Sequence, residues 1–104
     1  MKLSILYSSD AKKDLTSVWK GVLAASASFE LADEYLDEFM DMIDRKRDFP
    51  YSGSPLYYRG LFTGFYMINF KAYIAFYRVS ENFIEIARIL PAKMDYLKIL
   101  LDHY

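Results

Sequence analysis

The first half of the chain contains one segment in which polar and apolar residues alternate, and then two segments in which apolar residues recur with the period of a helix. Residues 2–7 largely alternate polar and apolar side chains, which predicts a short edge strand. Ser8 or Ser9 can then cap a helix whose first turn holds the acidic Asp10. The apolar positions of this helix recur at spacings of three and four, and they are Ala11, Leu15, Val18, Trp19, Val22 and Leu23. The pattern predicts a helix with one buried stripe, followed by a turn in residues 24–28.

A second helical stripe follows that turn. Its apolar positions are Phe29, Ala32, Leu36, Phe39, Met40 and Ile43. The remaining positions hold seven acids, which are Glu30, Asp33, Glu34, Asp37, Glu38, Asp41 and Asp44. Residues 45–47 are basic and close the last turn, so the charges suit the helix dipole, and Pro50 ends the segment. Two linked helices with one apolar stripe each predict an antiparallel hairpin that lies on a flat surface.

The second half of the chain supplies that surface in runs rich in β-branched and aromatic residues. Residues 51–55 predict a turn, and strand-like runs follow at 56–59, 65–70, 73–79 and 83–90. Because the breaks between the runs are short, we expect an antiparallel meander.

A short helix is expected after the meander. Pro91 stands where a helix can begin, and the apolar positions that follow are Met94, Leu97, Ile99, Leu100 and Leu101. The predicted element order is β-α-α-β-β-β-α. The predicted fold class is α+β, with a helical hairpin packed on a small antiparallel sheet, a short C-terminal helix, and residues 1–104 as a single domain.

The register of the last hairpin follows from its turn. If residues 81–82 form a two-residue turn, Ser80 pairs with Phe83. The residues opposite each other are then Arg78 with Glu85 and Phe76 with Ala87. Arg88 falls on the other face of the sheet from Arg78, so the two arginines can serve one site only if the turn is longer or a bulge intervenes.

Composition narrows the class of protein. The 104 residues are 54% hydrophobic and 26% charged with a net charge of -1, which suits one compact domain and excludes a disordered chain. The chain has no cysteine, which excludes disulfides and thiolate chemistry. We expect a cytoplasmic protein, because the sequence shows neither an apolar run long enough for a membrane span nor a signal-peptide pattern.

Aromatic residues make up 18% of the chain, and eight of the ten tyrosines lie at or after Tyr51. The aromatic residues that we expect in the core are Trp19, Phe29, Phe39 and Phe76. Those that we expect on a surface facing a partner are Tyr51, Tyr57, Tyr58 and Tyr66.

Residues suited to catalysis are few. His103 is the single imidazole and lies beside the chain end, and we assign no catalytic residue, no metal site and no cofactor. The cations of the second half are interleaved with tyrosines, and they are Arg59, Lys71, Arg78, Arg88 and Lys93. This arrangement resembles a nucleic-acid stacking surface, although alternating tyrosine is also typical of sheet packing. Because five cations on a chain of net charge -1 attract phosphate weakly, we do not expect direct nucleic-acid binding.

Segments spread over nearly the whole chain carry a family likeness. They lie at residues 8–15, 48–51, 73–79, 84–90 and 93–96. In this order they resemble the ParE branch of the RelE/ParE toxin superfamily. The resemblance implies the toxin half of a bacterial type II toxin-antitoxin module, a class associated with plasmid stabilization.

The two branches of that superfamily imply different activities. RelE-like members cut mRNA on the ribosome, whereas ParE-like members generally lack the RNase residues and many poison DNA gyrase. The long helical hairpin, the C-terminal helix and the near-neutral charge favour the ParE branch. The resemblance thus implies a binder, not an enzyme, that inhibits gyrase, is neutralised by a ParD- or RelB-like antitoxin, and can form a homodimer. The alternatives are a ribosome-dependent mRNA interferase, which is an endoribonuclease, and a toxin-fold interaction protein without toxicity.

The C-terminal residues offer a signal for the nuclease alternative. Some RelE relatives end in a His-Tyr pair that is used in RNA cleavage, and this chain ends in His103 and Tyr104. In those relatives the pair directly follows the last strand, whereas here a predicted helix intervenes, so we interpret the match as coincidence. The residues that we assign to contact with a partner or target are Arg59, Arg78, Arg88 and Lys93.

Overall fold

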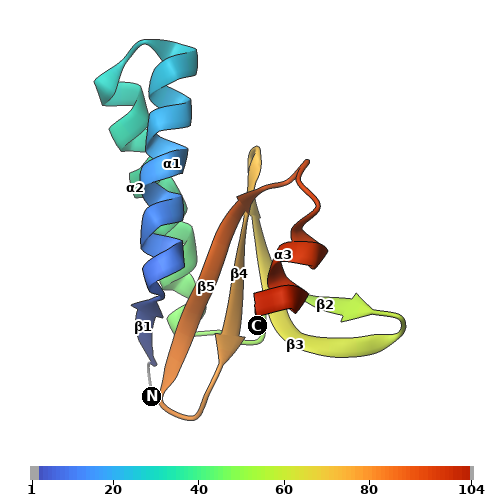
Figure 1. The fold of residues 1–104 in the computed structure, drawn as a ribbon. Coiled ribbons are helices and arrows are strands. Elements are labelled where there is room, and N and C mark those ends of the chain that lie inside the picture. Colours follow the sequence, from blue (N-terminus) through green and yellow to red (C-terminus); the bar gives the residue numbers. More distant parts are fainter. Residues whose placement is uncertain (1–2, 104) are drawn as a thin grey trace.

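The structure is a computed structural model that describes residues 3–103. Its elements in chain order are β1 (Ser4–Tyr7), α1 (Ser9–Ser26), α2 (Phe29–Asp44), the 3-10 helix η1 (Arg45–Arg47), β2 (Ser54–Tyr58), β3 (Leu61–Phe70), β4 (Tyr73–Val79), β5 (Phe83–Pro91) and α3 (Tyr96–His103). Figure 1 shows α1 and α2 on one side of the sheet and α3 on the other. The predicted α+β class and element order are confirmed, and the run at residues 56–59 contributes a further strand, β2.

The five strands form one sheet in the order β1-β5-β4-β3-β2. Strands β2 to β5 are antiparallel neighbours, as the short breaks between them predict. β1 pairs with β5 in parallel, so the sheet is mixed and the expectation of a purely antiparallel sheet is wrong for this pair. The reason is that no hairpin joins β1 to β5, since the helices and three other strands intervene, and β1 lies at the sheet edge as expected.

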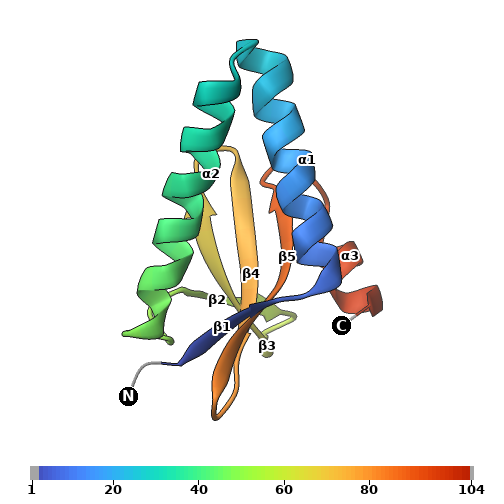
Figure 2. The ribbon, with the colours of Figure 1, turned by 90° about the vertical axis from the view of Figure 1, so that its left-hand side faces the viewer.

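The helical hairpin covers one face of the sheet (Figure 2). The Ser8 hydroxyl accepts a hydrogen bond from the Ala11 N–H, and the Ser28 hydroxyl likewise caps α2. Ala27 joins the helices in the left-handed conformation at φ 56°. The core beneath the hairpin consists of Ala11, Val18, Phe39, Ile43, Ile68, Phe70, Ala75, Tyr77, Ile84, Ile86 and Ile89. Within residues 3–103, no helix is long and apolar enough to cross a membrane.

A second core lies between α3 and the opposite face of the sheet. Its buried members are Leu56, Phe65, Ile74, Phe76, Ala87, Leu90 and Leu100. α3 begins at Tyr96, later than the expected start at Pro91. The reason is that Pro91 pairs with Tyr73 as the last residue of β5, and the next amide, that of Ala92, still donates to the Ala72 carbonyl.

The placement of the aromatic residues agrees in part with the expectation. Phe39 and Phe76 are fully buried, whereas Phe29 exposes 66% of its surface, so its expected place in the core is wrong. Phe29 is the first residue of α2, where the hairpin projects beyond the sheet, and it packs on Trp19 at 5.7 Å between ring centroids. An apolar stripe finds cover only where the sheet lies beneath it.

Candidate partner-binding surface

Four aromatic side chains form a connected surface at the β2–β3 side of the sheet. They are Tyr51, Tyr57, Phe62 and Tyr66, and we call them the aromatic surface. The ring centroid of Tyr66 lies 5.8 Å from that of Tyr51 and 5.2 Å from that of Phe62. Phe62 lies in turn 5.9 Å from Tyr57. Because Tyr51, Tyr57 and Phe62 expose 67%, 57% and 47% of their surface, this cluster has the character of an interaction site.

A bulge in β3 brings Phe62 next to Tyr66. Residues four apart in a regular strand are separated by about 13 Å. Between Phe62 and Tyr66, however, β3 holds three residues where the facing stretch of β2 holds Leu56 alone. Gly64 permits the bulge through its φ of 92°, and the Thr63 hydroxyl donates to the Leu56 carbonyl at 2.7 Å. Sequence reasoning missed Phe62, and the signal that marks it is Gly64, because an isolated glycine in a strand often indicates a bulge.

Tyr77 supports the aromatic surface from below. Its fully buried ring stacks on Tyr66 at 5.5 Å between centroids. Its hydroxyl donates to the Pro50 carbonyl at 2.8 Å and accepts from the Gly53 N–H at 3.0 Å, which fixes the loop that carries Tyr51. Burial raises the pKa of Tyr77, so this hydroxyl remains a donor.

We expect Tyr77→Phe to lower the free energy of unfolding by about 1–3 kcal/mol. The change leaves the Gly53 N–H and the Pro50 carbonyl without their partner, while the ring remains in place. Urea denaturation measures the effect, and Tyr66→Phe is the matched control because it removes a hydroxyl from the same ring stack. Equal stability of the two variants would contradict this account of the loop.

The β2–β3 turn places Tyr58 and Arg59 outside the aromatic surface. Arg59 and Gly60 have φ values of 52° and 79°, as in a two-residue type I′ turn. Tyr58 pairs with Leu61 and is 41% exposed, but it alternates with Tyr57 and therefore faces α3. The Arg59 guanidinium lies 5.4 Å from the centroid of the Tyr58 ring. The turn thus presents Arg59 at an exposed tip of the sheet.

Arg78 and Glu85 form the predicted cross-strand ion pair. The Ser80 N–H donates to the Phe83 carbonyl at 2.9 Å, which sets the expected register. The Arg78 guanidinium also lies 5.2 Å from the centroid of the Phe65 ring, on the α3 side. Because the two charged side chains are 41% and 32% exposed, solvent screens the pair and its contribution to stability is small.

The register of this hairpin changes beyond Tyr77. A bulge places Phe76 opposite Arg88, so the expected pair of Phe76 with Ala87 is wrong. The bulge lies where β1 gives way to α1, and the Ser8 hydroxyl there donates to the Ala87 carbonyl at 2.7 Å. A contact to a residue so distant in sequence is not visible in the hairpin's own pattern.

Arg88 reaches over the edge of β5 to α1. Its Nε and Nη2 donate to the two carboxylate oxygens of Asp14 at 2.8 and 3.0 Å. Asp14 also accepts the backbone N–H of Ile89 at 2.9 Å, and the charged side chains of the pair are only 19% and 13% exposed. The bulge also turns Arg88 to the face of the sheet that Arg78 occupies, so the expectation that the two arginines lie on opposite faces is wrong. Their ion pairs with different elements nevertheless keep them from forming one site.

The remaining predicted positions lie near the C-terminus. Lys93 is exposed in the turn between β5 and α3, and its contact with a partner stays a prediction. The side chain of His103 and the whole of Tyr104 lie outside the described residues. In the described part of the chain, no three His, Asp or Glu side chains gather as metal ligands would.

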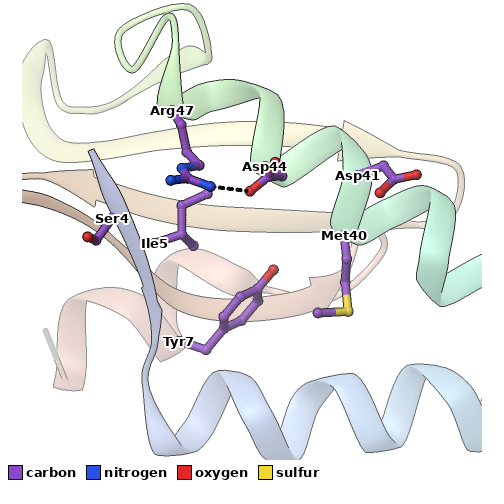
Figure 3. Close-up of a pocket in the computed structure, with 7 residues that line it drawn as sticks. All are labelled: Ser4, Ile5, Tyr7, Met40, Asp41, Asp44 and Arg47. Atoms are coloured by element: carbon purple, nitrogen blue, oxygen red, sulfur yellow. Dashed lines mark hydrogen bonds and ion pairs between the residues drawn. The ribbon is translucent and has the colours of Figure 1, made fainter. Parts of the chain in front are cut away.

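A groove of about 520 Å³ lies at the opposite edge of the sheet, between β1 and the C-terminal part of α2 (Figure 3). Its lining residues are Ser4, Ile5, Tyr7, Met40, Asp41, Asp44 and Arg47. Burial, and to a lesser degree the charge of Asp44, raise the pKa of Tyr7 to about 12. The groove thus combines apolar walls with acidic side chains.

The raised pKa of Tyr7 predicts a loss of stability in strong alkali. The pKa of Tyr7 in the folded protein, about 12, exceeds the ordinary value of 10.0. The contribution of the neutral Tyr7 to the free energy of unfolding is therefore complete below pH 10 and is lost as the pH rises through 12. The difference between the ultraviolet phenolate titrations of the wild type and Tyr7→Phe measures this pKa. Asp44→Asn should lower it without restoring the ordinary value, since burial is the larger cause. Titration of Tyr7 at its ordinary pKa would contradict the described packing.

Comparison with known proteins identifies the family. The sequence model of the family described as ParE toxin of type II toxin-antitoxin system, parDE, matches residues 5–96. A solved chain of the chromosomal ParDE system from P. aeruginosa has a TM-score of 0.74 at 16% identity, covering 88% of this chain and 98% of that one. A chain of the toxin-antitoxin complex RelBE2 from Mycobacterium tuberculosis has a TM-score of 0.53 at 20% identity, covering 88% and 99%.

These structural likenesses show the fold, and the sequence match shows the family. A search among curated protein sequences finds no match. Since the matched residues 5–96 span most of the chain, the protein belongs to the ParE toxin family of type II toxin-antitoxin systems.

Proposed function

We propose that this protein binds and inhibits DNA gyrase in the cytoplasm, and that a cognate antitoxin neutralises it by covering the aromatic surface. Membership of the ParE toxin family supports this class of target and partner. The likeness to a chain of a ParDE system supports it further. The proposed action is tight binding, with no covalent chemistry by the toxin.

The aromatic surface is the observation that carries the proposal. Tyrosine and other aromatic residues dominate the energetics of protein interfaces, because they bury a large area with little loss of conformational freedom. Here Tyr51, Tyr57 and Phe62 already contact one another or Tyr66, so a partner finds them ordered before binding. An antitoxin that covers the same rings blocks the contact with gyrase.

The placement of the arginines supports binding over RNA cleavage. The Arg78 and Arg88 guanidinium groups are paired with Glu85 and Asp14, so a phosphate would compete with a carboxylate for either of them. A net charge of -1 also gives little attraction to ribosomal RNA. We therefore propose Arg59 and Lys93, which are exposed on turns, as the cations that contact the partner or target.

Controlled expression in bacteria without an antitoxin tests the function. We expect arrested DNA replication and induction of the SOS response, and we expect the purified protein to inhibit supercoiling by gyrase in vitro. Rapid arrest of translation with cleaved messages would overturn the proposal in favour of an mRNA interferase. Normal growth together with uninhibited gyrase would overturn it in favour of a toxin-fold interaction protein.

A further inference from the structure

The tip of the helical hairpin exposes an apolar patch that the sheet does not cover. Figure 1 and Figure 2 both show the link between α1 and α2 beyond the ends of the strands. At this tip Phe29 exposes 66% and Leu31 exposes 51% of its surface. Phe29 packs on Trp19, whose Nε1 donates to Asp33 at 2.8 Å across the two helices. The tip therefore holds an ordered aromatic pair with one ring open to a partner.

Lysines form a stripe along the outer face of α1. Ala11 and Val18 are the buried residues of this helix. Lys13 and Lys20 each follow one of them by two positions, which is a rotation of about 200° in an α-helix. The two lysines therefore lie on the side of α1 away from the sheet, and both are exposed.

Carboxylates form a matching stripe along the outer face of α2. Ala32 and Phe39 are fully buried on this helix. Glu30 and Asp37 each precede one of them by two positions. By the same rotation, these two exposed acids lie on the side of α2 away from the sheet.

The two stripes run side by side with opposite charge. α1 and α2 are antiparallel neighbours (Figure 2), and Trp19 contacts both Phe29 and Asp33. Trp19 is therefore level with the turn between these two residues, which makes Lys20 level with Glu30. Among residues 3–103, the ion pairs of the structure involve neither Lys20 nor Glu30. Both charges thus remain available to a partner.

We propose that this outer face of the hairpin binds a second copy of the chain, in a symmetric dimer whose two-fold axis runs parallel to the helices. Rotation about such an axis places α1 of one copy against α2 of the other and keeps level residues opposite each other. Lys20 of each copy then faces Glu30 of the other, and Lys13 faces Asp37. Phe29 lies between the charged stripes and packs on the aromatic rings of the other copy.

The distribution of charge identifies the occupant. α2 carries seven acids and no basic residue, whereas the outer face of α1 carries lysines. A partner of one charge sign would be attracted by one stripe and repelled by the other. A second copy complements both stripes at once, because the same face supplies both charges. The face shares no residue with the aromatic surface or with the groove beside β1, so the dimer does not compete directly for those side chains.

Sedimentation equilibrium of the purified chain over a range of concentrations measures the dimer. We expect a reversible dimer that weakens as salt is added, because salt screens exposed charges. Lys20→Glu and Glu30→Lys should each raise its dissociation constant about tenfold or more, since symmetry places each reversed charge in two contacts. Phe29→Ser should weaken the dimer about tenfold or more through loss of its aromatic anchor. Lys98→Glu, an equal charge reversal on the exposed side of α3, should change the constant less than about twofold.

A mixture of the two charge-reversal variants tests the symmetry. In the mixed dimer, Lys20→Glu of one copy faces Glu30→Lys of the other, and the second contact keeps the native Lys20 and Glu30. We therefore expect an equimolar mixture to recover a dissociation constant within about threefold of the wild type, although neither variant dimerises well alone. Circular dichroism and urea denaturation check that each variant remains folded.

Three results would overturn the inference. A wild type that stays monomeric at every concentration would remove the second copy as the occupant, and loss of gyrase inhibition by Phe29→Ser would then assign the tip to the target. A dimer insensitive to both charge reversals would place the interface on another face. Failure of the mixture to recover would contradict the contact of α1 with α2. Because sedimentation reads self-association alone, its failure is distinguishable from failure of the gyrase proposal.

Discussion

Asp14→Ala is expected to lower the free energy of unfolding by about 3–5 kcal/mol, the largest loss of stability that we expect from a single substitution. Asp14 receives three hydrogen bonds, two from Arg88 and one from the Ile89 N–H. Its removal leaves the Arg88 side chain, which is 19% exposed, without this carboxylate, and the Ile89 N–H of β5 without this acceptor. Removing one partner of a largely buried ion pair costs more free energy than the pair contributes as a whole.

A double-mutant cycle separates the cost of removing one partner from the net contribution of the ion pair. Asp14→Ala combined with Arg88→Met removes both charges, and we expect the double variant to recover about half of the loss. Asp37→Ala is the matched control, because this aspartate lies exposed on α2 and should change stability by less than about 0.5 kcal/mol. Urea denaturation measures five proteins, which are the wild type, Asp14→Ala, Arg88→Met, their double variant and Asp37→Ala. An Asp14→Ala variant as stable as the control would show that the ion pair does not fasten α1 to β5.

The Arg88 pair also decides how toxicity data should be interpreted. Arg88 is a candidate for partner contact from its sequence position, but in the structure it joins α1 to β5. Loss of toxicity in Arg88→Ala therefore reports on the fold unless the variant's stability is shown to be unchanged. Arg59 carries no such complication, because it is exposed at a turn and its neighbour there is the ring of Tyr58.

Features set by neighbours in the sequence could be predicted. Ser8 as helix cap and Arg78 opposite Glu85 depend on spacings of a few residues, and both are confirmed. The parallel pairing of β1 with β5 and the bulge at Ala87 depend on contacts between residues nearly eighty positions apart. The periodic pattern of hydrophobic residues carries no information on contacts between residues so far apart in the sequence, which explains why these two features were predicted wrongly.

The candidate partner-binding surface likewise has one part that could be predicted from the sequence and one part that could not. The aromatic excess of the second half is visible in the sequence, and Tyr51 and Tyr57 are exposed as expected. Which face each ring occupies depends on pairing, so Tyr58 lies apart from Tyr57 and Phe62 joins it across the strand pair. Gly64 is the residue through which the sequence encodes this arrangement, because its positive φ allows the bulge.

Replacing both Tyr57 and Phe62 by serine is expected to abolish toxicity while the protein remains folded. The two rings contact each other at 5.9 Å and are 57% and 47% exposed, so they contribute to binding more than to the core. Two central aromatic residues of an interface are commonly worth about 3 kcal/mol together, which corresponds to roughly a hundredfold loss of affinity. The measurement is the protein concentration that half-inhibits gyrase supercoiling, together with survival after induced expression.

The same hairpin provides the control. Tyr58→Ser with Leu61→Ser removes exposed apolar side chains from the opposite face of β2 and β3, where the pair is 41% and 74% exposed. Both double variants introduce two serines into the β2–β3 hairpin, so a general loss of strand stability would affect both variants equally. We expect the control to retain inhibition within about threefold, because a contact at the rim of an interface contributes little. If the control loses inhibition and the Tyr57 and Phe62 variant keeps it, the α3 side of the sheet is the binding face and the aromatic surface is not.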